Sequence, residues 1–168
     1  MAEVYLLLGS NEGDRAEVLK IARRRLQNLS SRQIVVSSLY ETEPWGFESD
    51  VWFLNQAIKI ETELDPHVLL VKLLKIEKSL GRVREEKNEK DQKESCYSSR
   101  TIDIDILLYD NVVTNTAELQ LPHPRMHLRR FALMPLSEIN PGMIHPLLRK
   151  SIKELLEECP DRFGVIRI

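Results

Sequence analysis

The stretch that decides the fold is SSRTIDIDILLYD, residues 98–110. Its residues alternate between apolar and polar, as in a β-strand, where successive side chains point to opposite faces. The two faces would then hold Ile102, Ile104 and Ile106 on one side and Thr101, Asp103 and Asp105 on the other. The Cα atoms of Asp103 and Asp105 would lie about 6.6 Å apart, which is twice the rise per residue. We expect a strand that buries its isoleucines and presents two carboxylates on the other face.

Three further strands are predicted on the N-terminal side of this one. VYLLL ends at Gly9, IVVSSLY spans residues 34–40, and FLNQAIKI spans residues 53–60. Each is a short run rich in β-branched, aromatic or other apolar residues. Asp110-Asn111 predicts a turn after the aspartate strand.

Two helices separate these strands. Asp14 can cap a helix with apolar residues at helical spacing, and Asp65-Pro66 can open a second helix that ends before Gly81. The resulting order, β-α-β-β-α-β, is that of the split βαβ or ferredoxin-like arrangement. We therefore predict an α+β fold with a mainly antiparallel sheet. Ser151 and Glu154 predict a capping box for a later helix, so helices would cover both faces once the C-terminal additions are included.

Length and composition place the chain among ordinary globular proteins. With 168 residues, 42% hydrophobic and 30% charged, it is expected to form one domain over 1–168, with a charged, lid-like loop at about 82–100. The net charge of −2 predicts no nucleic-acid partner and no membrane surface. Two cysteines and a start without a signal-peptide pattern predict a cytoplasmic protein with reduced thiols. We expect a monomer.

The aspartate pair suggests a metal site. Two like charges at this spacing need a positive neighbour, and Mg²⁺ takes oxygen ligands while keeping waters and substrate phosphates. Asp103 and Asp105 could therefore hold one or two Mg²⁺ beside a nucleotide. The alternative is a strand whose acidic face is simply solvated.

Arginines and histidines flank the aspartate strand on both sides. No P-loop motif is present, so any bound phosphates would need scattered cationic side chains. The candidates are Arg82, Arg84 and Arg100 before the strand and His123, Arg125, His127, Arg129 and Arg130 after it. Guanidinium groups match phosphate oxygens geometrically, although any single arginine is more often a solvated surface residue. The polar segment EEKNEKDQKE, residues 85–94, is either a plain surface loop or a lid over this site.

Four aromatic residues are concentrated in TEPWGFESDVWFLN, namely Trp45, Phe47, Trp52 and Phe53. Aromatic side chains on a loop can stack on a flat heterocycle, and Asn55 could read its edge. The alternative is a loop whose aromatics fold onto the core. These features suggest metal-assisted phosphoryl-type transfer to a planar acceptor. A two-metal phosphohydrolase and a non-catalytic ligand-binding module remain as alternatives.

The order and spacing of these motifs resemble the 6-hydroxymethyl-7,8-dihydropterin pyrophosphokinase family of folate biosynthesis. The resemblance covers nearly the whole chain and is carried by LLLGSN, SSLYETEPWG, FLNQAI, IEKSLGRVR, RTIDIDILLYD and LPHPRMHLRRFALMPLSEINP. It implies a ferredoxin-like fold and pyrophosphate transfer from ATP to the pterin hydroxymethyl group, with release of AMP.

The resemblance also implies roles for individual residues. Asp103 and Asp105 match the ligands of two Mg²⁺ ions. The matched pterin positions are Thr42, Trp45, Phe53, Asn55 and Phe131, and those around ATP are Leu70, Glu77, Arg82, Arg84, Arg100, Ile106, His123 and Arg129. Arg84 and Arg100 would close over the phosphates, and Asp105 would be the carboxylate nearest the attacking hydroxyl.

Three features depart from the family pattern. Glu43 stands where proline is common, and Phe53 stands where tyrosine is common. The stretch after GRVR is longer than is typical by about eight residues. It carries CYSSR where tryptophan-glycine-proline-arginine is often seen, and Tyr97 is the candidate to replace that tryptophan.

Overall fold

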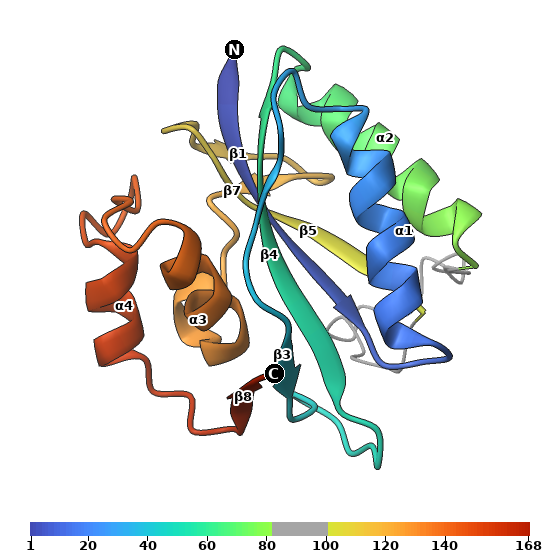
Figure 1. Cartoon of the computed structure of the whole chain (residues 1–168). Coiled ribbons are helices and arrows are strands. Elements are labelled where there is room, and N and C mark those ends of the chain that lie inside the picture. The colour runs from blue at the N-terminus through green and yellow to red at the C-terminus, as the bar shows by residue number, and fades with distance from the viewer. Residues whose placement is uncertain (82–100) are drawn as a thin grey trace.

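An antiparallel sheet whose strands differ in length forms the centre of the protein (Figure 1). The computed structural model describes residues 1–81 and 101–168. The strands of the sheet are β1 (Ala2–Ser10), β2 (Val35–Val36), β3 (Tyr40–Thr42), β4 (Phe53–Thr62), β5 (Asp103–Tyr109) and β8 (Val165–Arg167). Their order is β5-β1-β4-β3-β8, with β2 paired to β4, and every pairing is antiparallel.

The helices lie in two groups. They are α1 (Arg15–Gln27), α2 (Pro66–Ser79), α3 (Arg130–Ile139) and α4 (Ile152–Glu158), and a short 3₁₀ turn, η1 (Met126–Leu128), precedes α3. Figure 1 shows α1 and α2 on one face of the sheet and α3 and α4 on the other. Strands β6 (Thr114–Asn115) and β7 (Gln120–Leu121) form a separate pair beside β5. The predicted ferredoxin-like α+β fold with helices on both faces is confirmed.

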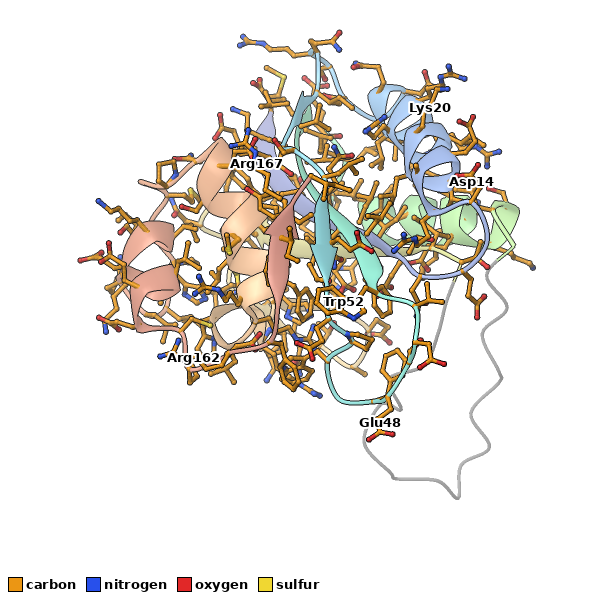
Figure 2. All side chains as sticks on the ribbon, turned by 60° about the horizontal axis from the view of Figure 1, so that its bottom comes forward. Asp14, Lys20, Glu48, Trp52, Arg162 and Arg167 are labelled. Atoms are coloured by element: carbon orange, nitrogen blue, oxygen red, sulfur yellow. The ribbon has the colours of Figure 1, made fainter. Side chains whose placement is uncertain are left out.

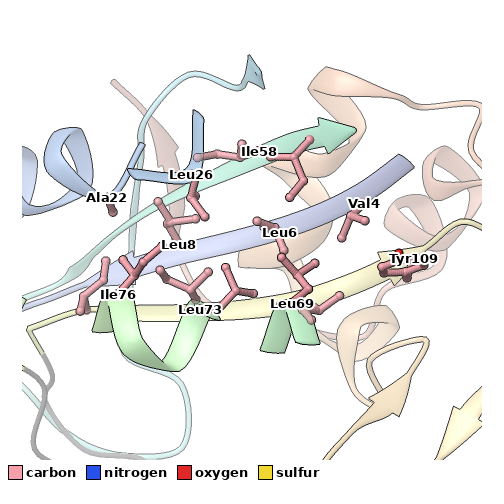
Figure 3. Close-up of a cluster of buried hydrophobic side chains, with 14 of the residues drawn as sticks. Val4, Leu6, Leu8, Ala22, Leu26, Ile58, Leu69, Leu73, Ile76 and Tyr109 are labelled. Carbon is pink, nitrogen blue, oxygen red and sulfur yellow. The ribbon is translucent and has the colours of Figure 1, made fainter. Parts of the chain in front are cut away.

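The central strand β1 is buried on both faces, because a core lies on each side of it. Val4, Leu6 and Leu8 point into the core beneath α1 and α2, which Figure 3 shows in close-up. Tyr5 and Leu7 point into the second core beneath α3 and α4. A strand between two apolar layers reads as a continuous hydrophobic run, which explains the uninterrupted VYLLL.

The predicted helix starts are confirmed by their hydrogen bonds. The carboxylate of Asp14 accepts from the Glu17 N–H at 3.0 Å, and that of Asp65 accepts from the His67 N–H at 3.0 Å. Ser151 and Glu154 form the predicted reciprocal capping box at α4. Each cap satisfies backbone donors that the first turn of a helix leaves without an intrahelical partner.

Several strands differ from the prediction, and the short pair β6 and β7 was not predicted. The run at 34–40 is interrupted, so β2 and β3 are separate short strands. The interruption lies at Ser37, whose Oγ accepts the Ala57 N–H at 3.0 Å in place of a regular strand bond. Strand β8 was not predicted, because its three residues are partly or largely exposed and carry no clear alternation. Among the residues described, no helix combines the length and hydropathy required to cross a bilayer.

Candidate functional site

A pocket opens to solvent where β1, β3, β4 and β5 come together beside α3, and its empty space, counted with the solvent at its mouth, is about 490 Å³. The strand register explains which side chains share it, since residues directly opposite each other point to the same face. Gly9 pairs with Asn55 on β4 and with Asp103 on β5, while Leu7 pairs with Asp105. The lining residues are Leu7, Gly9, Thr42, Glu43, Trp45, Phe47, Phe53, Asn55, Asp103, Asp105, Arg129 and Phe131.

One wall of the pocket carries a buried polar pair. The Asn55 side-chain amide donates to Thr42 Oγ1 at 2.6 Å, and both residues are almost fully buried. Gly9 permits this arrangement, because a Cβ atom there would lie 2.8 Å from Asn55 Oδ1. The amide and the threonine hydroxyl are therefore held in place at the pocket, where such groups can hydrogen-bond the edge of a polar ligand.

Aromatic rings surround this pair. Phe47 and Phe53 meet edge to face with their ring centroids 6.0 Å apart. The Arg129 guanidinium lies over the Trp45 ring at 5.0 Å and over the Phe131 ring at 5.6 Å. The structure thus brings together all five residues predicted for a flat heterocycle, and Trp45 and Phe47 of the β3–β4 loop also line the pocket, whereas Trp52 does not.

Arg129 precedes the first residue of α3 and is almost fully buried. Burial lowers the pKa of its guanidinium to about 10, so the group still carries its charge at neutral pH. The resemblance implies that Arg129 lies beside ATP, which remains a prediction. In the structure Arg129 lies on the pocket lining, over the Trp45 and Phe131 rings.

Asp103 and Asp105 lie half-buried at the start of β5 and line the same pocket. The predicted arrangement on one face of the strand is confirmed, since the alternating residue Ile104 belongs to the opposite core. Within residues 1–81 and 101–168, no cluster of three or more His, Cys, Asp or Glu forms a complete metal cage. Two carboxylates without further protein ligands fit Mg²⁺, which keeps positions for water and for substrate phosphates.

His123 does not belong to the pocket lining, although it is close enough to Asp103 to be affected by its charge. Burial lowers the pKa of its imidazole to about 4, although the nearby charge of Asp103 opposes this shift. Its Nδ1 accepts the Arg125 N–H at 3.2 Å, which leaves the proton of the neutral ring on Nε2. At neutral pH His123 therefore offers a neutral N–H donor and no positive charge.

Glu77 contacts strand β5 from the side of helix α2. This side chain on α2 is only 1% exposed, and its Oε1 accepts the Ile104 N–H at 2.8 Å. Leu70 and Ile106 belong to the core beneath α1 and α2, outside the pocket lining. The nucleotide contacts predicted for these three residues remain predictions.

Several predicted residues lie outside the described part of the chain. They are Arg82, Arg84 and Arg100, together with the charged segment that contains Tyr97. The structure also adds residues that the sequence reasoning did not assign to the site, namely Leu7, Gly9, Glu43 and Phe47. Two of these could have been found from the sequence, since Glu43 departs from the family pattern and Phe47 belongs to the aromatic segment. Leu7 and Gly9 reach the pocket only through the register of β1.

A family model for 7,8-dihydro-6-hydroxymethylpterin-pyrophosphokinase matches residues 5–141, which include every described residue of the pocket. The chain belongs to this family. Among curated members, it is 42% identical over 158 residues to 2-amino-4-hydroxy-6-hydroxymethyldihydropteridine pyrophosphokinase of Aquifex aeolicus, covering 94% of this chain and 92% of that protein. It is 39% identical over 169 residues to the protein of the same name from Methylorubrum extorquens, covering 100% and 99%.

Solved structures of the family share the fold. A Plasmodium falciparum HPPK-DHPS structure with pteroate matches with a TM-score of 0.71 at 16% identity, covering 94% of this chain. Another HPPK-DHPS structure in complex with substrates matches with a TM-score of 0.67 at 15% identity. This chain spans less than half of those two chains, 42% and 43%. At these identities the likeness establishes the fold alone.

Proposed function

We propose that this chain transfers pyrophosphate from ATP to the hydroxymethyl group of 6-hydroxymethyl-7,8-dihydropterin, giving AMP and the pterin diphosphate, in folate biosynthesis. Family membership supports this reaction. The observation that carries it in the structure is the composition of one pocket. Two strand carboxylates line one side, and an amide–hydroxyl pair among aromatic rings lines the other.

The pterin half of the proposal assigns each group a task. The ring would lie between Phe53 and Phe131, where aromatic faces stabilise a flat heterocycle. Asn55 and Thr42 would hydrogen-bond its polar edge, and because they already bind each other, little side-chain ordering would be needed when the substrate arrives. Trp45 and Arg129 would close the side of the pocket.

The phosphate half of the proposal requires two Mg²⁺ ions, for which Asp103 and Asp105 would be the protein ligands. When bound, such ions neutralise polyphosphate charge and lower the pKa of a coordinated hydroxyl. The carboxylate of Asp105 would lie nearest the pterin hydroxyl and receive its proton directly or through water. The oxygen of that hydroxyl would form a bond to the β-phosphorus of ATP. The bond between the β-phosphorus and the oxygen that bridges to the α-phosphate would break, and AMP would leave with that oxygen.

Neutral and cationic N–H donors would hold the rest of the nucleotide. His123 would donate a neutral N–H, and Arg82, Arg84 and Arg100, which lie outside the described residues, would contact the phosphates as the resemblance implies. Catalysis in such transfers depends mainly on positioning and on stabilising charge. We place the reaction in the cytoplasm.

The decisive experiment mixes the full chain with ATP, Mg²⁺ and 6-hydroxymethyl-7,8-dihydropterin and separates the nucleotides. We expect AMP in amounts equal to the pterin diphosphate, and no AMP when the pterin or Mg²⁺ is omitted. ADP or orthophosphate released without the pterin would instead support the two-metal phosphohydrolase. Binding of ATP that does not depend on Mg²⁺, without turnover, would support a non-catalytic module.

The two aspartates can be tested individually. Replacing Asp105 with Ala or Asp103 with Asn should lower kcat at least a hundredfold, because the polyphosphate would lose a ligand of its counter-ion. The fold should persist, since both side chains are half-buried at the pocket. The matched control is Glu118→Gln, which removes an exposed carboxylate remote from the pocket lining. An Asp105→Ala enzyme with near-normal turnover would contradict the metal role.

A further inference from the structure

We propose that Glu43 and Gly164 are positioning residues through which the C-terminal strand β8 holds the β3–β4 loop in the shape that closes the pocket. This loop, residues 43–52, carries Trp45 and Phe47. The inference rests on the proposed function for its substrate. It adds to that function a segment far along the chain, which contributes no residue to the pocket lining.

Two hydrogen bonds join Glu43 to Gly164. The Glu43 N–H donates to the Gly164 carbonyl at 2.9 Å, and the Gly164 N–H donates to Glu43 Oε2 at 2.7 Å. The first continues the ladder in which Thr42 of β3 pairs with Val165 of β8. The second uses the side chain, and a hydrogen bond to a carboxylate is stronger than one between neutral groups. Glu43 is thus fixed at the point where the chain leaves β3 and enters the pocket wall.

Gly164 also provides the surface on which Trp52 packs. A Cβ atom at position 164 would lie 2.9 Å from Trp52 Cη2 and 3.3 Å from Cζ3, so the indole edge lies directly against the glycine backbone. Any larger residue would displace the ring. Figure 2 shows Trp52 at the base of the β3–β4 loop, whereas Glu48 lies at its outer tip, away from β8.

The far end of the loop is held from a third element. Arg15, the first residue of α1, donates from its guanidinium to the Trp52 carbonyl at 2.6 Å. The loop is therefore fixed at both ends, at Glu43 by Gly164, the residue before β8, and at Trp52 by Gly164 and by Arg15 of α1. Trp45 and Phe47 lie between these two points and line the pocket. A loop fixed before the ligand arrives costs less ordering free energy on binding.

This arrangement depends on the residue at position 43. A residue without a backbone N–H and without a side-chain acceptor, such as proline, could form neither bond to Gly164. Both bonds therefore depend on a residue such as glutamate at position 43.

The test compares Glu43→Ala, Glu43→Gln and Gly164→Ala with the wild-type chain. Glu43→Ala removes the side-chain acceptor, and Glu43→Gln keeps an oxygen acceptor without the charge. We expect KM for the pterin to rise about tenfold in Glu43→Ala, the equivalent of about 1.4 kcal/mol. We expect kcat and the KM for ATP to change by less than about twofold, since the aspartates are untouched. Glu43→Gln should restore most of the pterin affinity.

A second readout does not depend on turnover. Both tryptophans of the chain, Trp45 and Trp52, lie in this loop, so the intrinsic tryptophan fluorescence reports on it alone. Acrylamide should quench this fluorescence more strongly in ligand-free Glu43→Ala and Gly164→Ala than in the wild type. The matched control is Glu48→Ala, which removes an exposed carboxylate from the tip of the same loop and should change neither readout.

The outcomes separate this inference from the proposed function. A wild-type chain that makes no AMP would reject the function, whereas the quenching measurement would still test the loop. An active wild type with unchanged pterin KM and unchanged quenching in Glu43→Ala would overturn the positioning role. Failure of Glu43→Gln to restore affinity would also overturn it, because the carboxylate charge would then be acting on the substrate directly.

Discussion

At the scale of the residue, the pocket depends on Gly9, because its lack of a side chain leaves room for Asn55. Gly9 lies on β1 opposite both Asn55 and Asp103, so it stands between the amide proposed to bind the pterin and the first of the two strand carboxylates. Because glycine adds no Cβ, Asn55 can turn its amide toward Thr42. Glycine in a strand often marks such a close approach.

Gly9→Ala should therefore impair substrate binding more than folding. The new Cβ would lie 2.8 Å from Asn55 Oδ1, so the amide must shift and its bond to Thr42 would be distorted. We expect KM for the pterin to rise about tenfold. Gly142→Ala is the matched control, since the nearest atom to its Cβ would be Asn140 Oδ1 at 4.0 Å. Equal kinetics in the two variants would contradict the role given to Gly9.

At the scale of the element, the position of strand β5, which carries Asp103 and Asp105, depends on helix α2. Glu77 projects from α2 into the core and accepts the Ile104 N–H, the backbone donor between the two aspartates. A buried carboxylate is costly unless it is hydrogen-bonded, so this contact is expected to be specific. The helix thereby fixes the start of β5, which β1 supports only from one edge.

Glu77→Ala should destabilise the protein by about 1–3 kcal/mol, because it leaves the buried Ile104 N–H without its acceptor. Glu77→Gln keeps an oxygen acceptor and should cost less. Urea denaturation of the three proteins measures the difference. Turnover should fall in Glu77→Ala even where the protein remains folded, because Asp103 and Asp105 flank the affected residue. An alanine variant as stable and as active as the wild type would contradict this account.

A second contact between elements gives an alkaline pH dependence. Tyr40 on β3 donates its hydroxyl to Glu138 on α3 at 2.7 Å. Burial, together with this bond, raises the pKa of Tyr40 from 10.0 to about 12. Because the unfolded chain loses this proton at lower pH, the stabilisation is complete below pH 10 and is lost as the pH rises toward 12. Between neutral pH and pH 10, where Glu138 stays ionised, the free energy of unfolding of the wild type should therefore exceed that of Tyr40→Phe by a constant amount.

That difference between wild type and Tyr40→Phe should shrink between pH 10 and pH 12, which chemical denaturation at a series of pH values would measure. Comparison with the phenylalanine variant cancels the titration of the other tyrosines and lysines. A difference that stayed constant up to pH 12 would mean that the tyrosine hydroxyl titrates at the same pH in both states.

At the scale of the whole molecule, one sheet carries two hydrophobic cores. Leu73 of α2 belongs to one and Leu136 of α3 to the other, and both are fully buried. Strand β1 contributes alternate residues to each core, so loss of either layer exposes one face of the same strand. The pocket lies on the α3 side, whereas Glu77 acts from the α2 side, and both layers are therefore needed for the site.

Leu73→Ala and Leu136→Ala should each lower the free energy of unfolding by about 2–5 kcal/mol. If the chain is one domain, as its length predicts, both variants should still unfold in a single transition. Far-ultraviolet circular dichroism and tryptophan fluorescence should then give coincident midpoints. Separate midpoints in Leu136→Ala would show that the two layers unfold independently and would reject the single-domain prediction.

The sequence predicted some elements of the fold and missed others. The alternation in RTIDIDILLYD identified strand β5 and its two faces, and the capping residues at 14, 65 and 151 identified three helix starts. These features are local, so neighbouring residues suffice to specify them. Strand β8 and the break at Ser37 were missed, because both depend on partners far away in sequence.

The sequence by itself determined the order of the main strands and helices, the shared face of Asp103 and Asp105, and the family to which the chain belongs. Tertiary structure decided what reaches the pocket. Gly9 meets Asn55 through the register of β1 with β4, and Glu43 meets Gly164 through the addition of β8 to the edge of the sheet. Strand pairing brings together residues more than a hundred positions apart, and local periodicity carries no information about which strands will pair.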